Sequence, residues 1–198
     1  MDLFSSGTEL VSIPVEDGEL AMLAPLPLPI SSAEVLARLV DETPWRADTI
    51  VVYGKRWLQP RLSAWYGEAS YTYSGLRLEP LPMTPLLERL RAAVEAATGH
   101  RYNSVLLNCY RDGADSMGMH ADDEPELGPC PVIASLSFGA TRTFVLRHKV
   151  SKRTLKLDLT DGSLLLMGGA LQHNWLHGIN KTARPTALRV NLTFRFVV

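Results

Sequence analysis

The sequence predicts a mainly β protein, a sandwich or jelly roll with helices flanking one of its sheets. From residue 103 to the end, short runs of leucine, β-branched and aromatic residues follow one another, and clusters of Gly, Pro and Asp separate several of them. Two amphipathic segments precede these strands and would cover one sheet face. Strands are expected at 104–110, 132–138, 143–148, 155–159, 163–167 and 187–198.

Both helices have start and stop signals. Ser31 and Glu34 have the spacing of a capping box, and Pro44 ends the first helix. Thr84 is an N-cap residue followed by proline in the first helical turn, and Gly99 stops the second helix. Each helix carries an apolar stripe, so both are expected to pack on a sheet.

Composition places the chain among ordinary globular proteins. It has 198 residues, of which 46% are hydrophobic and 21% charged, with a formal net charge of -1. This balance argues against disorder, and any nucleic-acid binding must come from a local patch rather than from overall charge. The two cysteines form no C-x-x-C pair, so free thiols are expected rather than a disulfide framework or zinc ribbon.

We expect one soluble, intracellular domain over residues 1–198. No secretory leader is evident, and the apolar stretch 20–30 is too short and proline-rich to span a membrane. The protein would be cytoplasmic in a bacterium, and nuclear or cytoplasmic in a eukaryote. No obligate interface is evident, so a monomer is expected. Within the domain, 1–30 is expected to be an irregular lead-in, 31–102 a helical segment and 103–198 the strand-rich core.

His120 and Asp122 lie two positions apart, which on an extended strand points both side chains to the same face. An imidazole and a carboxylate need one more imidazole to form the two-histidine, one-carboxylate set that binds iron with open coordination positions. Such a pair also occurs by chance in many proteins, so its value depends on a third ligand.

Four further histidines are candidates for the third ligand. His100 follows a helix end, where the helix dipole favours a cation, and His148 lies in a basic run that is expected to be exposed. His173 and His177 remain, and on a strand or turn only one of them could join His120. His177 is flanked by tryptophan and leucine, so it is expected to be the more buried of the two.

The last predicted strand alternates between two faces. One face is apolar, and the other carries Arg189, Asn191, Thr193 and Arg195. This pattern is common in an edge strand with one solvated face. It also suits a diacid site, because six residues of strand span roughly 20 Å and two inward-leaning arginines could each bind a carboxylate bidentately. Spacing alone does not decide between these interpretations.

Several stretches of the chain, taken together, resemble a known family. They are residues 64–68, 71–74, 103–110, 120–125, 133–140, 173–177 and 189–195. The chain resembles the AlkB-type iron(II)/2-oxoglutarate dioxygenases, most closely the animal AlkB homologues that repair alkylated DNA and RNA. The resemblance implies a double-stranded β-helix, which is a jelly roll, preceded by an N-terminal α/β nucleotide-recognition part within 31–102.

The resemblance also assigns roles within the pocket. The iron ligands that it implies are His120, Asp122 and His177. The residues that it places around 2-oxoglutarate are Asn108, Tyr110, Arg189, Asn191, Thr193 and Arg195. Arg189 would bind the distal carboxylate, while Arg195 and Asn191 would serve the carboxylate that chelates iron. Arg195 would also orient Asp122, and Thr193 would line the pocket wall.

On the substrate side, the resemblance implies that Tyr71 and Tyr73 stack on a flipped, damaged base. Such stacking contributes roughly 1–3 kcal/mol per base, although an aromatic pair on a strand is also typical of a protein core. Asp123 would bind the exocyclic amine of a cationic methylated base, with Glu124 nearby.

More distant contacts with nucleic acid are implied at two places. Tyr53 lies where one branch of the family carries a phenylalanine that wedges into duplex DNA, and Arg61 matches a DNA contact. Lys149, Lys152 and Arg153 suit a phosphate patch, but a short charge run of this kind is also typical of a solvated hairpin.

The reaction implied by the resemblance is oxidative demethylation of N1-methyladenine and N3-methylcytosine in DNA, with RNA as a second substrate. It would use Fe(2+), 2-oxoglutarate and O2, and would release succinate, CO2 and formaldehyde. The alternatives are a 2-oxoglutarate-dependent hydroxylase of a protein or small molecule, a non-catalytic reader of alkylated nucleic acid, and a cupin-like metal sensor. Tyr71, Tyr73 and Asp123 suit a flat cationic base, which argues against the hydroxylase. The complete ligand set argues against the non-catalytic reader. Arg189 and Arg195 argue against the cupin-like sensor, which would not need two arginines to hold a diacid.

Overall fold

The computed structural model describes the backbone of residues 9–198 apart from 48, 53–54, 69–70 and 74–75, and it leaves out the side chains of 50–57 and 71–78 as well. The helices of the described part are α1 (Ser32–Glu42), α2 (Pro85–Thr98), the 3-10 helix η1 (Pro125–Leu127) and α3 (Leu171–Asn174). Its strands are β1 (Val11–Ser12), β2 (Glu19–Leu23), β3 (Thr49–Val52), β4 (Lys55–Leu58), β5 (Leu62–Gly67), β6 (Tyr71–Tyr73), β7 (Leu76–Leu78), β8 (Ser104–Tyr110), β9 (Met117–His120), β10 (Ile133–Gly139), β11 (Arg142–His148), β12 (Thr154–Leu159), β13 (Leu164–Gly168), β14 (Trp175–Ile179) and β15 (Arg189–Arg195).

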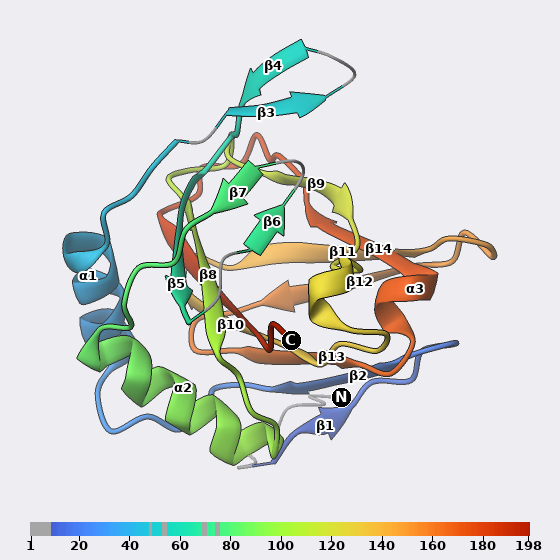
Figure 1. Cartoon of the computed structure of the whole chain (residues 1–198), viewed down its shortest axis with the longest axis horizontal. Coiled ribbons are helices and arrows are strands. Elements are labelled where there is room, and N and C mark those ends of the chain that lie inside the picture. Colours follow the sequence, from blue (N-terminus) through green and yellow to red (C-terminus); the bar gives the residue numbers. More distant parts are fainter. Residues whose placement is uncertain (1–8, 48, 53–54, 69–70, 74–75) are drawn as a thin grey trace.

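Most strands belong to two antiparallel sheets that pack face to face (Figure 1). The large sheet has the order β1-β2-β13-β10-β15-β8-β5, and the small sheet has the order β12-β11-β14-β9. Ile133 and Met167 of the large sheet share an apolar cluster with Leu146 and Trp175 of the small sheet. Two facing antiparallel sheets of this kind make a jelly roll, so the prediction of a mainly β fold is confirmed.

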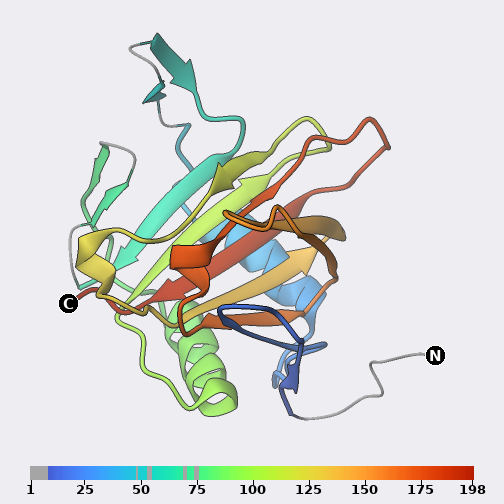
Figure 2. The same cartoon turned by 90° about the vertical axis from the view of Figure 1, so that its right-hand side faces the viewer.

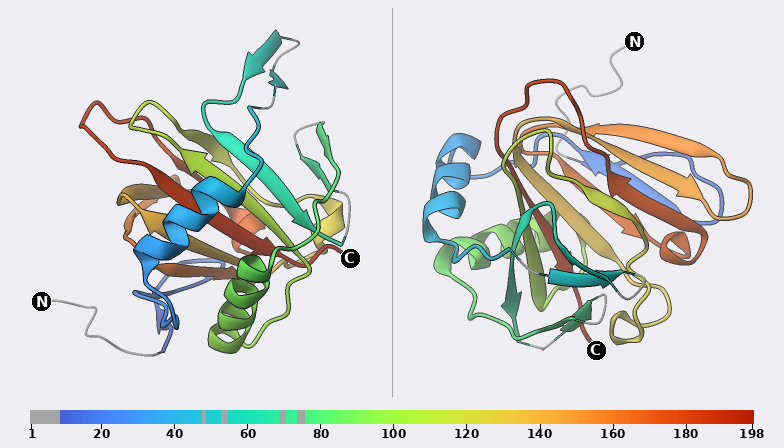
Figure 3. Two further views of the ribbon diagram at one scale, coloured as in Figure 1. Left: turned by 90° about the vertical axis from the view of Figure 1, so that its left-hand side faces the viewer. Right: turned by 90° about the horizontal axis from the view of Figure 1, so that it is seen from above.

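Both predicted helices are confirmed, with their caps. The Ser31 Oγ accepts the main-chain N–H of Glu34 at 3.2 Å, and the Thr84 Oγ1 accepts that of Leu87 at 3.2 Å. Gly99 ends α2 in the left-handed conformation, with φ of 73°, which a glycine adopts without a Cβ penalty. Figure 3 shows α1 and α2 lying across the outer face of the large sheet.

β15 lies in the middle of the large sheet, between β10 and β8. All of its residues are buried, so the interpretation as an edge strand with a solvated face is wrong. Val190, Leu192 and Phe194 pack into the core cluster under the helices. The alternate residues face the interior between the two sheets, where they line a pocket.

Residues before 103 contribute more to the sheets than the sequence indicates. The prediction of an irregular lead-in at 1–30 is wrong for two segments, because β1 and β2 pair with each other and β2 pairs with β13. Leu20 and Met22 alternate into the core, but the proline-rich stretch that follows them hides this short period-2 signal. Since β2 and β5 belong to the large sheet, the strand-rich core does not begin at residue 103.

Two short strands of the small sheet escape the sequence pattern. β9 and β14 each contain a glycine and only four or five residues, which is too little for a clear alternation. The hairpins β3–β4 and β6–β7 project from the sheets near β5 (Figure 2). In the described part of the chain, none of the helices has the length and apolar character needed to cross a bilayer.

Candidate metal centre and anion pocket

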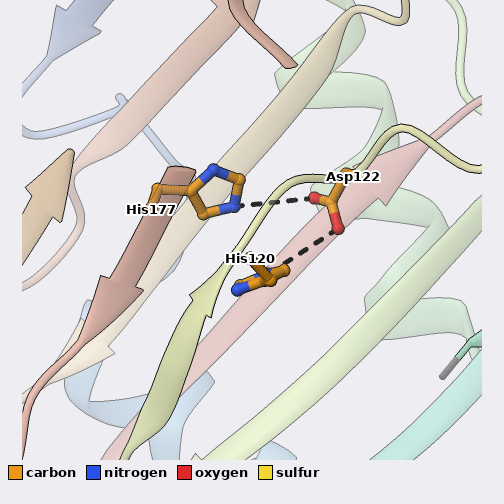
Figure 4. A group of neighbouring side chains, drawn as sticks. All are labelled: His120, Asp122 and His177. Atoms are coloured by element: carbon orange, nitrogen blue, oxygen red, sulfur yellow. Dashed lines mark ion pairs between the residues drawn. The ribbon is translucent and has the colours of Figure 1, made fainter. Parts of the chain in front are cut away.

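Two histidines are brought together by strand pairing. His120 ends β9 and His177 lies in β14, and the two residues are opposite each other in the register of the small sheet. Their ring centroids are 4.4 Å apart. Figure 4 shows both imidazoles turned toward Asp122. The pairing therefore resolves the open choice between His173 and His177, because the His173 ring lies elsewhere, against the carbonyl oxygen of Pro129.

Asp122 completes the group from outside the strand. β9 ends at His120, so the carboxylate converges on the histidines from the irregular segment that follows and not from a continuing strand. Its oxygens lie 3.8 Å from the His120 Nε2 and 3.9 Å from the His177 Nε2. Arg195 Nη2 donates to both carboxylate oxygens at 2.9 Å, as the resemblance implied.

The electrostatics of the group suit a cation. Burial opposes ionisation of Asp122, but the positive charge of Arg195 and the neighbouring histidines outweigh it and lower the pKa of Asp122 to about 2. Burial and the neighbouring His120 lower the pKa of His177 to about 3. The carboxylate is thus charged and His177 is neutral at neutral pH, which is the protonation state that metal binding requires.

The donor set fits a transition metal. His120 Nδ1 lies 2.8 Å from the Gly118 carbonyl oxygen, so Nδ1 carries the proton and Nε2 offers its lone pair toward Asp122. Within the described residues, His120, Asp122 and His177 form a group whose ligand atoms all lie within 4.8 Å of one another. Two imidazoles and one carboxylate match the facial set of non-haem iron(II) sites.

Arg189 marks the second half of the pocket. It is 1% exposed, and burial lowers the pKa of its guanidinium. Its Nη2 donates to the Ser137 Oγ at 3.0 Å, and its Cζ lies 5.1 Å from the centre of the Tyr110 ring. Its Nε and Nη1 are buried without a hydrogen-bond partner among the described residues, and no carboxylate of that part pairs with it. An unpaired buried cation is costly, so this position fits an anionic ligand.

The wall between the metal ligands and Arg189 is polar and hydrogen-bonded. Asn191 Nδ2 donates to the Ser135 Oγ at 2.8 Å and to the Leu136 carbonyl at 3.1 Å, and its Oδ1 accepts from the Thr193 Oγ1 at 3.1 Å. The predicted metal and diacid residues therefore meet in one pocket. The members of that pocket named from the sequence are Asn108, Tyr110, His120, Asp122, His177, Arg189, Asn191, Thr193 and Arg195.

Arg61 is buried beside Asn108, a residue of the pocket wall, and does not lie on a surface open to DNA. It is 4% exposed, and its Nε donates to the Asn108 Oδ1 at 2.8 Å. Little guanidinium surface is left for a phosphate, so the expected contact with nucleic acid does not suit this position. The resemblance that implied a DNA contact at Arg61 contains no information on whether the side chain is buried.

The residues implied on the substrate side are placed only in part. Asp123 is exposed beside the metal ligand, with the Lys149 Nζ 3.5 Å from its Oδ2, and Glu124 precedes η1. Tyr71 and Tyr73 lie on β6, which confirms the strand, but their side chains are outside the described part of the chain. Tyr53 also falls outside the described residues, between the paired strands β3 and β4.

Three buried polar residues at the site were missed, and the burial of a fourth residue, His148, was misjudged. Ser135 accepts a hydrogen bond from Asn191, and Ser137 accepts one from Arg189. The two serines lie two positions apart in β10, and this alternation of polar and apolar residues could have indicated a polar inner face. Gln172 contacts Asp122 across 50 positions, for which the sequence holds no signal. His148 was expected to be exposed but is 4% exposed, because its Nδ1 accepts main-chain N–H groups from the hairpin turn that follows it.

The fold and the site together define a jelly-roll oxygenase of the non-haem iron class. Residues 24–195 match the model of the 2OG-Fe(II) oxygenase superfamily, and the chain belongs to that family. It is similar to a solved structure described as "The structure of OsALKBH1", with a TM-score of 0.66 over 93% of this chain and 99% of that chain. At 16% identity, that likeness concerns the fold alone.

Curated relatives confirm the resemblance to AlkB-type dioxygenases. The chain is 46% identical over 173 residues to human alpha-ketoglutarate-dependent dioxygenase alkB homolog 3, covering 82% of this chain and 60% of the relative. It is 45% identical over 159 residues to human DNA oxidative demethylase ALKBH2, covering 75% of this chain and 61% of the relative. The chain thus spans about three fifths of the length of these relatives.

Proposed function

We propose that this chain is an iron(II)- and 2-oxoglutarate-dependent dioxygenase that oxidatively demethylates N-alkylated bases in DNA or RNA. The observation that carries the proposal is the shared pocket, in which the group of His120, Asp122 and His177 faces the unpaired guanidinium of Arg189. Similarity to relatives named as an alpha-ketoglutarate-dependent dioxygenase and a DNA oxidative demethylase supports both the cosubstrate and the substrate class.

One group of pocket residues would bind the metal, and a second group would bind the cosubstrate. His120, Asp122 and His177 would hold iron on one side, which leaves the remaining positions for a cosubstrate and O2. Arg189 would bind the distal carboxylate of 2-oxoglutarate, and Tyr110 and Ser137 hold its guanidinium in place. When bound, iron(II) with 2-oxoglutarate and O2 supplies the oxidation of the N-methyl group, which leaves as formaldehyde while succinate and CO2 form.

The substrate site would be formed by Asp123 and by the projecting hairpins β3–β4 and β6–β7. Asp123 directly follows Asp122, the proposed metal ligand, and its exposed carboxylate lies 3.5 Å from the Lys149 Nζ. A negative charge there favours a base that methylation has made cationic. Tyr71 and Tyr73 of β6 would supply the stacking platform, so that the hairpins β3–β4 and β6–β7 act as a nucleotide-recognition part.

The proposal is tested with an oligonucleotide carrying N1-methyladenine or N3-methylcytosine. The protein is incubated with iron(II), ascorbate and O2, with or without 2-oxoglutarate, and mass spectrometry measures the restored base and succinate. Repair should occur only with 2-oxoglutarate. Succinate formation without repair would overturn the nucleic-acid substrate in favour of a protein or small molecule. Absence of any turnover with metal bound would instead favour a non-catalytic reader.

Two variants of Tyr73 distinguish an effect on substrate binding from an effect on metal binding. Tyr73→Ala should weaken binding of the methylated oligonucleotide by about 1–3 kcal/mol, because a stacking ring is lost, and should leave metal binding unchanged. Tyr73→Phe keeps the ring and should behave like the unmodified protein. Equal binding of the oligonucleotide by all three proteins would remove Tyr73 from the substrate site.

A further inference from the structure

The candidate metal ligands are held in place in two different ways. His120 and His177 lie opposite each other on the paired strands β9 and β14, so the hydrogen bonds of the small sheet set their positions. Asp122 lies beyond the end of β9, where the described main chain is no longer part of a strand. Its position therefore depends on contacts with side chains from other elements.

Within the described residues, Arg195 and Gln172 make such contacts, at opposite ends of Asp122. Arg195 binds the carboxylate, with both oxygens 2.9 Å from its Nη2. Gln172 binds the main chain, because its Oε1 accepts the N–H of Asp122 at 3.0 Å. Gln172 belongs to α3, the turn that leads directly into β14 and His177. Its amide thus joins the segment that carries one ligand to the strand that carries another.

The orientation of the Gln172 amide follows from the group that it meets. The side chain is 1% exposed, so the N–H of Asp122 finds its acceptor in protein. Oε1 must face this donor, and Nε2 then lies 3.8 Å from the Met167 Sδ. A flipped amide would set two donors against each other and leave a buried N–H unsatisfied, which costs about 1–3 kcal/mol.

Lys149 holds the other side of the same turn. Its Nζ donates to the main-chain oxygen of Gln172 at 3.1 Å and lies 3.5 Å from the Asp123 Oδ2. The main-chain N–H of Lys149 donates to the Asn174 carbonyl at 2.7 Å. α3 is therefore tied both to the hairpin after β11 and to the acidic segment beside the metal ligands, so a shift of Gln172 would be resisted from two directions.

We propose that Gln172 is a positioning residue for the metal centre, acting through the main chain of Asp122. Its amide oxygen fixes the position of the Asp122 main chain relative to His120 and His177. It thereby sets the separation of the carboxylate from the two imidazoles. The inference rests on the proposed function, because it takes Asp122 as a metal ligand. Loss of a residue that orients a metal ligand lowers metal affinity about 10–100-fold in comparable sites.

The test replaces Gln172 with methionine, which keeps the volume of the side chain and removes the acceptor. Co(II), a spectroscopic substitute for Fe(II), is titrated into the metal-free full chain by calorimetry, and its visible absorption reports the ligand geometry. Gln172→Met should bind Co(II) about 10–100-fold more weakly and shift the absorption bands. Gln172→Glu retains an acceptor oxygen at the same reach and should keep the wild-type bands.

Asn174→Ala is the matched control within α3. The Asn174 Nδ2 donates to the carbonyl oxygens of Ala170 at 3.0 Å and Asp17 at 3.1 Å, and no hydrogen bond joins it to Asp122 in the described part of the chain. This variant should lower the Tm about as much as Gln172→Met while leaving Co(II) affinity and bands unchanged. A metal-binding effect confined to Gln172→Met would separate positioning from a merely structural role.

The outcomes distinguish the inference from the proposed function. Wild-type Co(II) affinity and bands in Gln172→Met, whatever its Tm, would overturn the role of Gln172. Failure of the unmodified protein to bind Co(II) would instead overturn the proposed metal centre. If Gln172→Met does not fold, Gln172→Asn supplies the same comparison, because a side chain one methylene shorter draws the acceptor away from Asp122.

Discussion

The two faces of β15 are both buried, yet they carry opposite chemistry. Toward α1 and α2, Val190, Leu192 and Phe194 are fully buried in an apolar core. Toward the small sheet, four polar residues line the pocket, and none is more than 7% exposed. They are Arg189, Asn191, Thr193 and Arg195. Burial stabilises the first face, whereas on the second face it costs free energy unless hydrogen bonds or a ligand offset it.

Burial alone therefore does not indicate a stabilising role. Residues of the helix-facing side should report on folding, and residues of the pocket-facing side should report on binding. Arg195 should report on both folding and binding, because the protein itself supplies its counter-ion, Asp122. Arg189 is the extreme case, because its counter-ion is absent from the described residues. Four substitutions test this division, in order of expected effect.

Asp122→Ala should have the largest effect. Metal binding should be lost, because two imidazoles remain without the carboxylate, and demethylation should fall below detection. The apo protein should also lose about 3–5 kcal/mol of unfolding free energy, because Arg195 is left as an uncompensated buried charge. Calorimetry with Co(II) and urea unfolding measure the two effects. Asp123→Ala is the neighbouring control and should still bind metal; full metal affinity in Asp122→Ala would refute the ligand assignment.

Phe194→Ala should be the most destabilising change on the helix-facing side. Phe194 is 0% exposed and packs near the Tyr102 ring, at a centroid distance of 6.1 Å. Its removal should lower the unfolding free energy by about 3–5 kcal/mol in urea, with Co(II) affinity unchanged under conditions where the variant is folded. Phe196→Ala is the control, because Phe196 is 49% exposed and should cost no more than about 0.5 kcal/mol.

Arg189→Met should separate binding from stability. Binding of 2-oxoglutarate to the metal-loaded protein should weaken by about 2–5 kcal/mol, because the cosubstrate carboxylate loses a buried partner. The apo protein should be as stable as the wild type or more so, since a desolvated, unpaired guanidinium is replaced by an apolar side chain. A stability loss comparable to that of Phe194→Ala would break the proposed division between the two faces.

Thr193→Val should have the smallest effect. The two side chains have similar shapes, so the change removes the hydrogen bond from the Thr193 Oγ1 to the Asn191 Oδ1 and little else. The affinity for 2-oxoglutarate should fall by no more than about 1.5 kcal/mol, and the midpoint of urea unfolding should stay near the wild type. A larger loss of affinity would assign Thr193 a direct contact with the cosubstrate.

Much of this architecture follows from local patterns. The caps at Ser31 and Thr84 and the alternation of β15 are short-range signals, and the structure confirms them. β2 was missed because its alternation spans only five residues beside a proline-rich segment, and only pairing with β13 makes it part of a sheet. The burial of Arg61 and His148 could not be predicted, because basic side chains carry no local mark of the partner that buries them.

Composition is enough to show which residue types are available for chemistry. The two-residue period of a strand is enough to predict that the polar and apolar residues of β15 lie on opposite faces. Tertiary structure decided that the polar face is buried, that His177 and not His173 joins His120, and that Asp122 is held by Arg195 and Gln172. These choices depend on strand order and on contacts across 50 or more positions of chain, which no local spacing encodes.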